Sequence, residues 1–158
     1  KRTISDGLDS DFSSGIIKNS HFEDINGDGI DFSGSKVKVL NSYFNNIKDK
    51  AVSVGEGSNL EISSIYLNNI GVGLASKDGS KVLIENSSFS NINLNSLMTY
   101  QKKSFYRKSE LIGLNLSFDD ASKCCIRQTG SKMEVNKMMI NQMRINIDSL
   151  YQNEIMRK

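Results

Sequence analysis

The chain repeats a short sequence every 22 or 23 residues, and this repeat restricts its fold more than any other feature. A glycine and a serine followed by alternating apolar residues recur in four segments, Gly34–Val39, Gly57–Ile62, Gly79–Ile84 and Gly130–Val135. Such a period is typical of solenoids, in which each repeat forms one coil that stacks on the next. Stacking therefore explains most of the patterned residues, and functional residues are best sought among those that break the repeat.

Each repeat has a second half with its own apolar positions. One position is occupied by Phe22, Phe44, Leu67, Phe89, Phe118 and Ile140, and another, three residues later, by Ile25, Ile47, Ile70 and Ile92. From Gly79 to its counterpart Lys108 the spacing is 29 residues, which places an insertion of about six or seven residues near 98–107. The chain therefore holds about six coils of 22–23 residues.

The pattern within a coil indicates strands. Apolar residues alternate in Val37-x-Val39, Leu60-x-Ile62 and Val82-x-Ile84, and a period of two is the period of a β-strand. Gly, Ser, Asn and Asp fill the gaps and favour turns. Leucine-rich repeats have a similar period, but they need a Leu-x-x-Leu-x-Leu frame, whereas this chain uses β-branched residues and Phe. We therefore predict an all-β fold, a parallel β-helix.

Equivalent residues of successive coils are expected to form columns about 4.8 Å apart. The Phe and Ile positions predict two interior stacks. The polar columns, such as Asn19, Asn41 and Asn86, are interpreted as amide ladders inside turns. His21, the only histidine, shares an outer position with Tyr43 and Tyr66 and is interpreted as a surface residue.

We expect one β-helix domain over residues 1–148, with 149–158 as a C-terminal tail or short cap. Ile145-x-Ile147 resumes the alternating pattern, which places these residues in the solenoid. The first residue is Lys, and an open solenoid end exposes strand edges. The sequence therefore predicts a part of a longer protein, with flanking domains or other subunits covering the solenoid ends.

Composition excludes several classes. The chain has 20 Lys and Arg against 18 Asp and Glu, too even a balance for a nucleic-acid-binding surface. No run is apolar enough to span a membrane. Cys124 and Cys125 are adjacent, and in a strand they point to opposite faces, so a bond between them is expected to be strained. Two cysteines alone do not make a disulfide framework.

An acidic cluster breaks the repeat. Asp6-Gly-Leu-Asp9 aligns with Asp28-Gly-Ile-Asp31 at a spacing of 22 residues, so Asp6 stacks with Asp28 and Asp9 with Asp31. Like charges stacked about 4.8 Å apart cost stability. The cost indicates a bound cation, a neighbouring lysine or a raised carboxylate pKa. Lys50 occupies the next place in the Asp28 column and is able to neutralise it.

Three interpretations of this cluster stay open. Ca²⁺ is the one cofactor considered, because it prefers oxygen ligands, here Asp6, Asp9, Asp28 and Asp31. Acid/base chemistry on a polysaccharide has Asp28, Asp31 and Lys50 as catalytic candidates. The third interpretation is that these residues only form and cap turns.

The polar strip continues into later coils and the insertion. A basic and aromatic loop beside an acidic strip is suited to gripping a sugar polymer. The candidate carbohydrate-binding residues are Glu56, Lys77, Asp78, Tyr100, Lys102 and Lys103.

The coils resemble the right-handed parallel β-helix repeats of the pectate-lyase-like superfamily over about residues 6–143. Several segments are similar to bacterial right-handed β-helix domains, a group with no established activity, some of which occur in larger surface or secreted proteins. These segments are Asp6–Phe12, Gly27–Ser35, Asp49–Glu56, Ala75–Asp78 and Tyr100–Lys103. The resemblance implies a right-handed solenoid, carbohydrate association by analogy, and a secreted or cell-surface location.

The sequence patterns and the resemblance predict two possible functions. The first is a non-catalytic, carbohydrate-associated module of a larger secreted or cell-surface protein. The alternative is a polysaccharide lyase, epimerase or hydrolase acting at the strip. The catalytic patterns of related enzymes are missing: Arg2 is the only arginine before Arg107, and an Asp-Pro-His motif cannot exist in a chain without proline. The first function is therefore favoured.

Overall fold

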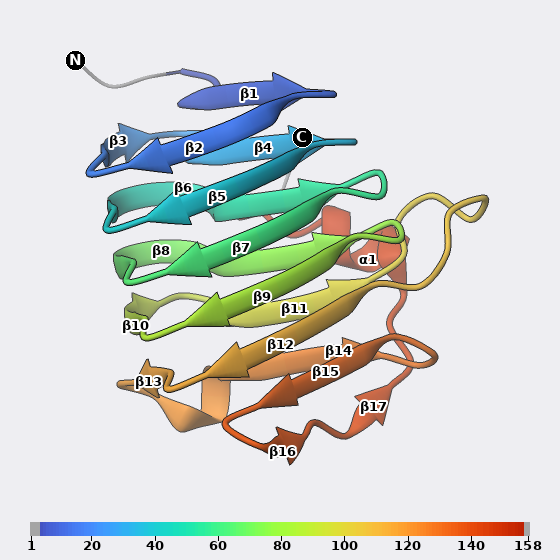
Figure 1. The fold of residues 1–158 in the computed structure, drawn as a ribbon. Coiled ribbons are helices and arrows are strands. Elements are labelled where there is room, and N and C mark those ends of the chain that lie inside the picture. Colours follow the sequence, from blue (N-terminus) through green and yellow to red (C-terminus); the bar gives the residue numbers. More distant parts are fainter. Residues whose placement is uncertain (1–3, 157–158) are drawn as a thin grey trace.

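The structure is a computed structural model that describes residues 4–156. It is a solenoid of about six turns, in which parallel strands of successive coils pair with one another (Figure 1). Sheet A contains, in spatial order, β1 (Leu8–Asp11), β4 (Ile30–Ser33), β6 (Tyr43–Gly55), β8 (Tyr66–Lys77), β11 (Leu97–Tyr100), β14 (Cys125–Gln128) and β17 (Gln142–Met143). Sheet B contains β2 (Ser14–Lys18), β5 (Lys36–Leu40), β7 (Asn59–Ser63), β9 (Lys81–Glu85), β12 (Glu110–Leu114), β15 (Lys132–Val135) and β16 (Met138–Met139).

A third side of the coil is formed by shorter strands. These are β3 (His21–Ile25), β10 (Ser88–Ile92) and β13 (Ser117–Phe118), which pair with the first halves of β6 and β8 or with each other. The long strands β6 and β8 bend around the corner from this third side into sheet A. A full coil therefore has three strand segments.

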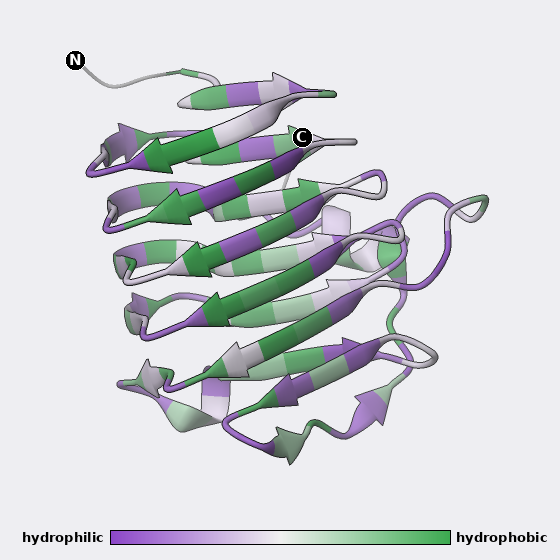
Figure 2. Ribbon diagram, in the orientation of Figure 1, coloured by the Kyte–Doolittle hydropathy of each residue, from purple (hydrophilic) through white to green (hydrophobic). Residues whose placement is uncertain are grey.

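The core consists of the predicted columns. Phe22 lies in register with Phe44, and their rings stack with centroids 4.9 Å apart; Phe89 and Phe118 stack at 5.2 Å. The Ile25, Ile47, Ile70 and Ile92 column is also in register and buried. Figure 2 shows the resulting alternation of hydrophobic and hydrophilic residues along the strands. Burial of each such side chain stabilises the solenoid by about 1.5–3 kcal/mol.

The Asn columns occupy left-handed turn positions. Asn19, Asn41, Asn86 and Asn115 have φ values of 51, 47, 50 and 52°, a region that Asn tolerates better than most residues. The Gly of each Gly-Ser pair is also left-handed, as at Gly34 with φ 61°. The serine that follows is buried, and at Ser35 and Ser58 its hydroxyl accepts a backbone N–H of the preceding coil, from Ser13 and from Ser35, both at 3.0 Å. The repeat thus encodes turns whose backbone groups are satisfied between coils.

The expected insertion is present, with a shifted boundary. The sequence places it near 98–107, but Leu97–Tyr100 forms β11, in register with Leu74–Lys77 of β8. The extra residues therefore lie at 101–109, between β11 and β12. The start of this loop is held by Asp78, whose carboxylate accepts the backbone N–H groups of Lys102 and Lys103, both at 2.7 Å.

The C-terminal part differs from the pattern in the sequence. Ile145 and Ile147 do not resume the solenoid, because Asn146 caps the short helix α1 (Ile147–Tyr151) by accepting the N–H of Ser149 at 3.1 Å. Residues 144–156, here called the C-terminal segment, pack on the outside of sheet A rather than in the core. Of the predicted tail or cap at 149–158, residues 157–158 lie outside the described part of the chain.

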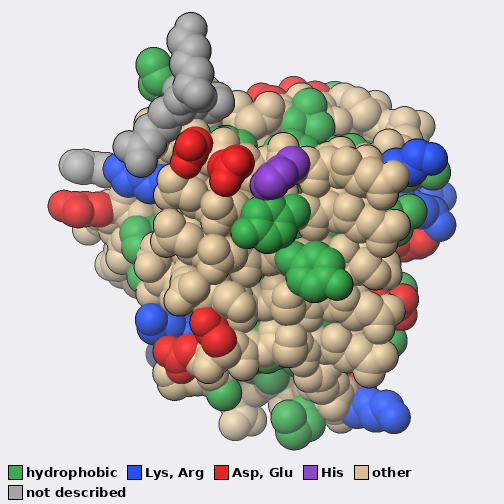
Figure 3. All heavy atoms as spheres, turned by 90° about the vertical axis from the view of Figure 1, so that its left-hand side faces the viewer, with side chains coloured by type: hydrophobic (Ala, Val, Ile, Leu, Met, Phe, Trp, Pro, Cys, Tyr) green, Lys and Arg blue, Asp and Glu red, His purple; other side chains and the backbone are tan. Residues whose placement is uncertain are grey.

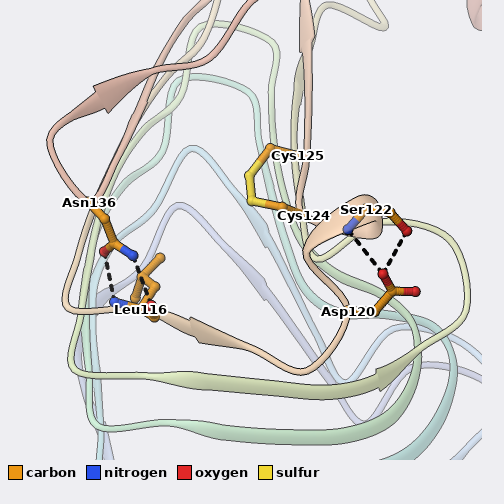
Figure 4. Close-up of a disulfide and its surroundings, with 6 residues drawn as sticks. All are labelled: Leu116, Asp120, Ser122, Cys124, Cys125 and Asn136. Carbon is orange, nitrogen blue, oxygen red and sulfur yellow. Dashed lines mark hydrogen bonds between the residues drawn. A yellow bond between two sulfur atoms is a disulfide. The ribbon is translucent and has the colours of Figure 1, made fainter.

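Cys124 and Cys125 form a disulfide, which the strand argument did not anticipate (Figure 4). Cys124 does not lie in a strand. It ends a 3₁₀ turn, Ala121–Lys123, in a helical backbone conformation, and β14 begins only at Cys125. Because the backbone turns between the two residues, their sulfur atoms reach the same side. Asp120 starts this turn by accepting both the N–H and the hydroxyl of Ser122.

Asn136 provides a test of how the last coil is closed. Its side chain accepts the N–H of Leu116 at 2.9 Å and donates to the Leu116 carbonyl at 2.8 Å (Figure 4), while its own φ is 50°. We expect Asn136→Ala to lower the free energy of unfolding by about 1–3 kcal/mol, because two backbone groups lose their partner and the left-handed backbone is strained. Chemical denaturation of Asn136→Gly separates the causes, since Gly loses the same hydrogen bonds but tolerates the left-handed backbone; equal stability of all three proteins would contradict the assignment.

Candidate functional site

The outer face of sheet A changes from polar to apolar along the solenoid. One outward column reads Asp9, Asp31 and Ser53 in the first coils, and Ala75, Met98 and Ile126 in the later ones. The polar half therefore lies toward the N-terminal coils and the apolar half toward the C-terminal coils. A surface with this division needs a cover over its apolar half only.

The C-terminal segment is that cover. Val72, Ala75, Met98 and Tyr100 form a buried cluster with Met156, outside the solenoid core. Leu94, Ile126, Ile145, Ile147, Leu150, Tyr151 and Ile155 pack against this cluster. The fit is close at Gly71, where a Cβ atom would lie 2.1 Å from the Lys48 carbonyl oxygen and 2.5 Å from the Ile155 side chain. Only glycine allows the segment to approach the sheet this closely.

A buried charged cluster lies at the edge of this cover. Lys50 Nζ is 3.0 Å from Asp28 Oδ1 and 2.6 Å from Asp49 Oδ1, and the three residues have exposed fractions of 1, 0 and 2%. Hydrogen bonds also link the members of this column from coil to coil. Asp28 Oδ1 accepts the backbone N–H of Lys50 at 3.0 Å, and Asp6 Oδ1 accepts the backbone N–H of Asp28 at 2.7 Å. Lys50 therefore neutralises the acidic column, as its position in the repeat indicates.

The charge of Lys50 is stabilised by its surroundings. Burial by itself lowers the pKa of a lysine, but the attraction of Asp28 and Asp49 outweighs it, so the pKa of Lys50 is raised. The ammonium group lies where a cation bound to Asp28 and Asp49 would have to lie. Among residues 4–156, no group of three or more His, Cys, Asp or Glu is arranged to hold a metal ion. The Ca²⁺ site predicted from Asp6, Asp9, Asp28 and Asp31 therefore gains no support from the geometry.

Two tyrosines join the C-terminal segment to the sheet. The hydroxyl groups of Tyr100 and Tyr151 lie 2.7 Å apart, and Tyr100 is fully buried. Lys102 Nζ lies 4.2 Å from the centre of the Tyr151 ring, in a cation–π contact. Burial raises the pKa of Tyr100 well above its ordinary value and also raises the pKa of Tyr151.

These shifts predict that the protein loses stability in alkali. The unfolded chain releases a tyrosine proton near pH 10.0, whereas folded Tyr100 keeps it, so the free energy of unfolding falls as the pH rises above about 10. Each such group contributes up to about 1.4 kcal/mol per pH unit. Urea denaturation between pH 9 and 11 measures this slope, and we expect a shallower slope for Tyr100→Phe. Identical slopes for the two proteins would contradict the burial of this hydroxyl.

The rest of the predicted strip is less deeply buried, although the side chains of Lys77 and Asp31 are only 11 and 20% exposed. The open strip consists of Asp9, Asp31, Glu56, Lys77, Lys102 and Lys103. Within it, Lys77 Nζ lies 3.8 Å from Asp31 Oδ1, and Lys103 forms an ion pair with Glu56. Burial lowers the pKa of Lys77, aided by the charges of Lys50 and Lys102, although Asp31 opposes the shift. The hydrogen bond to Glu56 raises the pKa of Lys103.

The structure thus divides the sequence-predicted residues into two groups. Of the catalytic candidates, Asp28 and Lys50 meet but are buried, and Asp31 lies in the next outward column beside Lys77. Asp78 and Tyr100 were predicted as carbohydrate contacts, but both are buried, since Asp78 holds the insertion and Tyr100 contacts Tyr151. Asp49 and Tyr151 were not predicted as part of any site. Asp49 directly precedes Lys50, whereas no repeat signal points to Tyr151.

The comparison with protein families agrees with this architecture. A family model described as a right handed beta helix region matches residues 5–154. The chain belongs to the right-handed β-helix family. This membership is consistent with the resemblance to the pectate-lyase-like superfamily. Searches of the curated proteins and of the solved structures found no match to this right-handed β-helix. Within residues 4–156, no helix has the length and apolar character needed to cross a membrane.

Proposed function

We propose that this β-helix is a non-catalytic module of a larger secreted or cell-surface protein and that it associates with carbohydrate through the open strip. The observation that carries the proposal is the burial of the charged cluster of Asp28, Asp49 and Lys50. An acid/base pair must reach the glycosidic oxygen or a proton on the sugar ring. Groups buried between the sheet and the C-terminal segment do not have this access.

The open strip supports a sugar-binding role. Its carboxylates accept hydrogen bonds from hydroxyl groups, and its ammonium groups donate to hydroxyl and carboxylate oxygens. Lys102 and Lys103 extend the strip along the insertion, beside Glu56 and Lys77. Such a mixture of charges favours a polysaccharide that bears acidic groups as well as hydroxyl groups. Flanking domains would attach the module to its larger protein.

One observation favours a second candidate, a polysaccharide lyase or epimerase. The pKa of Lys77 is lowered, and a lysine with a lowered pKa is a better base near neutral pH. Lys77 could take the proton beside the carboxylate of an acidic sugar, and Lys102 is close enough to influence its charge. In a lyase reaction the electron pair of the broken C–H bond would then form a double bond as the glycosidic oxygen leaves. The unsaturated product absorbs ultraviolet light, which gives a direct test.

Calorimetric titration with acidic polysaccharides tests the proposal. We expect saturable binding by the wild type and at least tenfold weaker binding by the double variant Asp31→Asn/Lys77→Gln. The control is Lys38→Gln/Glu61→Gln, which removes an exposed ion pair on sheet B and should bind like the wild type. Undiminished binding by the first double variant would exclude the open strip as the site. An ultraviolet-absorbing product formed by the wild type but not by Lys77→Gln would favour the lyase.

A further inference from the structure

A second ordered surface lies on the third side of the coil, away from the open strip. Here the aromatic–amide face comprises His21, Tyr43 and Tyr66 in one outward column and Glu23, Asn45 and Asn68 in the next, with Asn91 beside it. These residues come from β3, the first halves of β6 and β8, and β10. Figure 3 shows the histidine with two large side chains in line below it, on a broad and nearly flat surface.

The aromatic column is held in place and is accessible. His21 contacts Tyr43 edge to face, with ring centroids 4.7 Å apart and planes at 84°. Tyr66 lies in register one coil further on and is 56% exposed, and His21 is exposed as well. Because each ring stands on a rigid strand, the spacing of the column is fixed before any ligand arrives. A preordered aromatic surface loses little conformational entropy on binding.

The amide column forms a continuous hydrogen-bonded ladder. Asn91 Nδ2 donates to Asn68 Oδ1 at 2.8 Å, and Asn68 Nδ2 donates to Asn45 Oδ1 at 2.9 Å. Asn45 Nδ2 in turn donates to Glu23 Oε1 at 2.9 Å. The ladder uses one N–H and one lone pair of Asn45 and of Asn68, and each amide has two of both. One donor and one acceptor site of each amide therefore stay available, in a fixed direction.

The charges on this face select the chemistry of a ligand. A third outward column on this face is the turn column Asp24, Asn46, Asn69 and Asn91. The described charges in the three columns are carboxylates: those of Glu23 and Asp24, and that of Asp119, which accepts the Asn91 N–H at 2.6 Å. These carboxylates repel anionic polymers such as nucleic acids and acidic polysaccharides. Aromatic rings have a negative face that attracts polarised C–H groups, and amides bond hydroxyl groups. Both features fit the C–H faces and hydroxyl groups of a neutral sugar.

We propose that the aromatic–amide face binds a neutral polysaccharide, with the glycan chain lying along the solenoid axis. Sugar rings would stack on Tyr43 and Tyr66, and their hydroxyl groups would bond Asn45 and Asn68. This site extends the proposed carbohydrate association to a second face and a second class of polymer. It does not depend on the open strip, because it uses other residues and its described charges are carboxylates only, whereas the open strip has three acidic and three basic residues.

Calorimetric titration with a soluble β-glucan, a galactomannan and the acidic polymer polygalacturonate tests this inference. We expect the wild type to bind a neutral polymer and Tyr43→Ala/Tyr66→Ala to bind it at least tenfold more weakly. Phe105→Ala is the matched control, because Phe105 is a 79% exposed aromatic residue in the insertion. Both this control and Asp31→Asn/Lys77→Gln should keep the affinity for the neutral polymer. If the double tyrosine variant unfolds, the exposed single variant Tyr66→Ala should still weaken binding several-fold.

The other outcomes overturn the inference. They are unchanged neutral-polymer binding by the tyrosine variants, equal loss in Phe105→Ala, or no binding of either neutral polymer by the wild type. Polygalacturonate binding that is lost only in Asp31→Asn/Lys77→Gln, together with no binding of a neutral polymer, would leave the proposed function standing while this inference fails. Neutral-polymer binding without any polygalacturonate binding would support this inference and contradict the proposed function. The two proposals therefore fail independently.

Discussion

Replacing Lys50 by methionine is expected to lower the free energy of unfolding by about 3–5 kcal/mol, because breaking a buried ion pair leaves a charge in a medium that solvates it poorly. In this protein the variant leaves the carboxylates of Asp28 and Asp49 buried without the ammonium group, which lies 3.0 and 2.6 Å from them. Urea denaturation followed by circular dichroism measures the change.

Two controls separate this effect from a general loss of charge. Lys38→Met removes the exposed pair with Glu61, and such surface pairs contribute about 0–1 kcal/mol. The triple variant Asp28→Asn/Asp49→Asn/Lys50→Met removes the buried charges together, and we expect it to recover part of the lost stability. If Lys50→Met were no more destabilising than Lys38→Met, the cluster would not be buried as described.

Removal of the C-terminal segment together with residues 157–158 is expected to leave a folded but less stable β-helix. The solenoid core does not include this segment, whereas Val72, Met98 and Tyr100 would become exposed. Counting only two of its packed side chains at about 1.5–3 kcal/mol each gives a loss of roughly 3–6 kcal/mol. The exposed apolar surface should also bind a hydrophobic dye, which fluorescence measures together with the unfolding transition.

The control for this truncation is Met138→Ser/Met139→Ser in the last coil. These methionines are exposed at the surface, so their replacement should change neither stability nor dye binding. A truncated chain with the stability of the full chain and no dye binding would show that the segment does not cover sheet A.

The repeat predicts much of the fold because each column is a local pattern seen several times. Phe44 and Ile47 fill interior positions that the period alone assigns, and the 22-residue register is observed from β1 to β4 as Asp9 beside Asp31. The same reasoning places Lys50 in the Asp28 column, so the ion pair follows from the spacing. These features depend on stacking, which the sequence expresses directly.

The features that were missed occur once and have no repeat to reveal them. The C-terminal segment packs on sheet A through a capped helix, so Ile147 lies outside the core although its spacing resembles a strand. The same contact buries Tyr100, which the sequence placed on a ligand surface. The turn that brings Cys124 to Cys125 is a local backbone conformation that alternation cannot indicate.

We propose that this β-helix binds polysaccharide without turning it over, and isothermal titration calorimetry tests the binding and the lack of turnover in one experiment. Injecting a bound polymer is predicted to give heat pulses that saturate and return to the baseline after each injection. A continuous heat signal that persists until the polymer is consumed, and that Lys77→Gln abolishes, would show catalysis and contradict the claim.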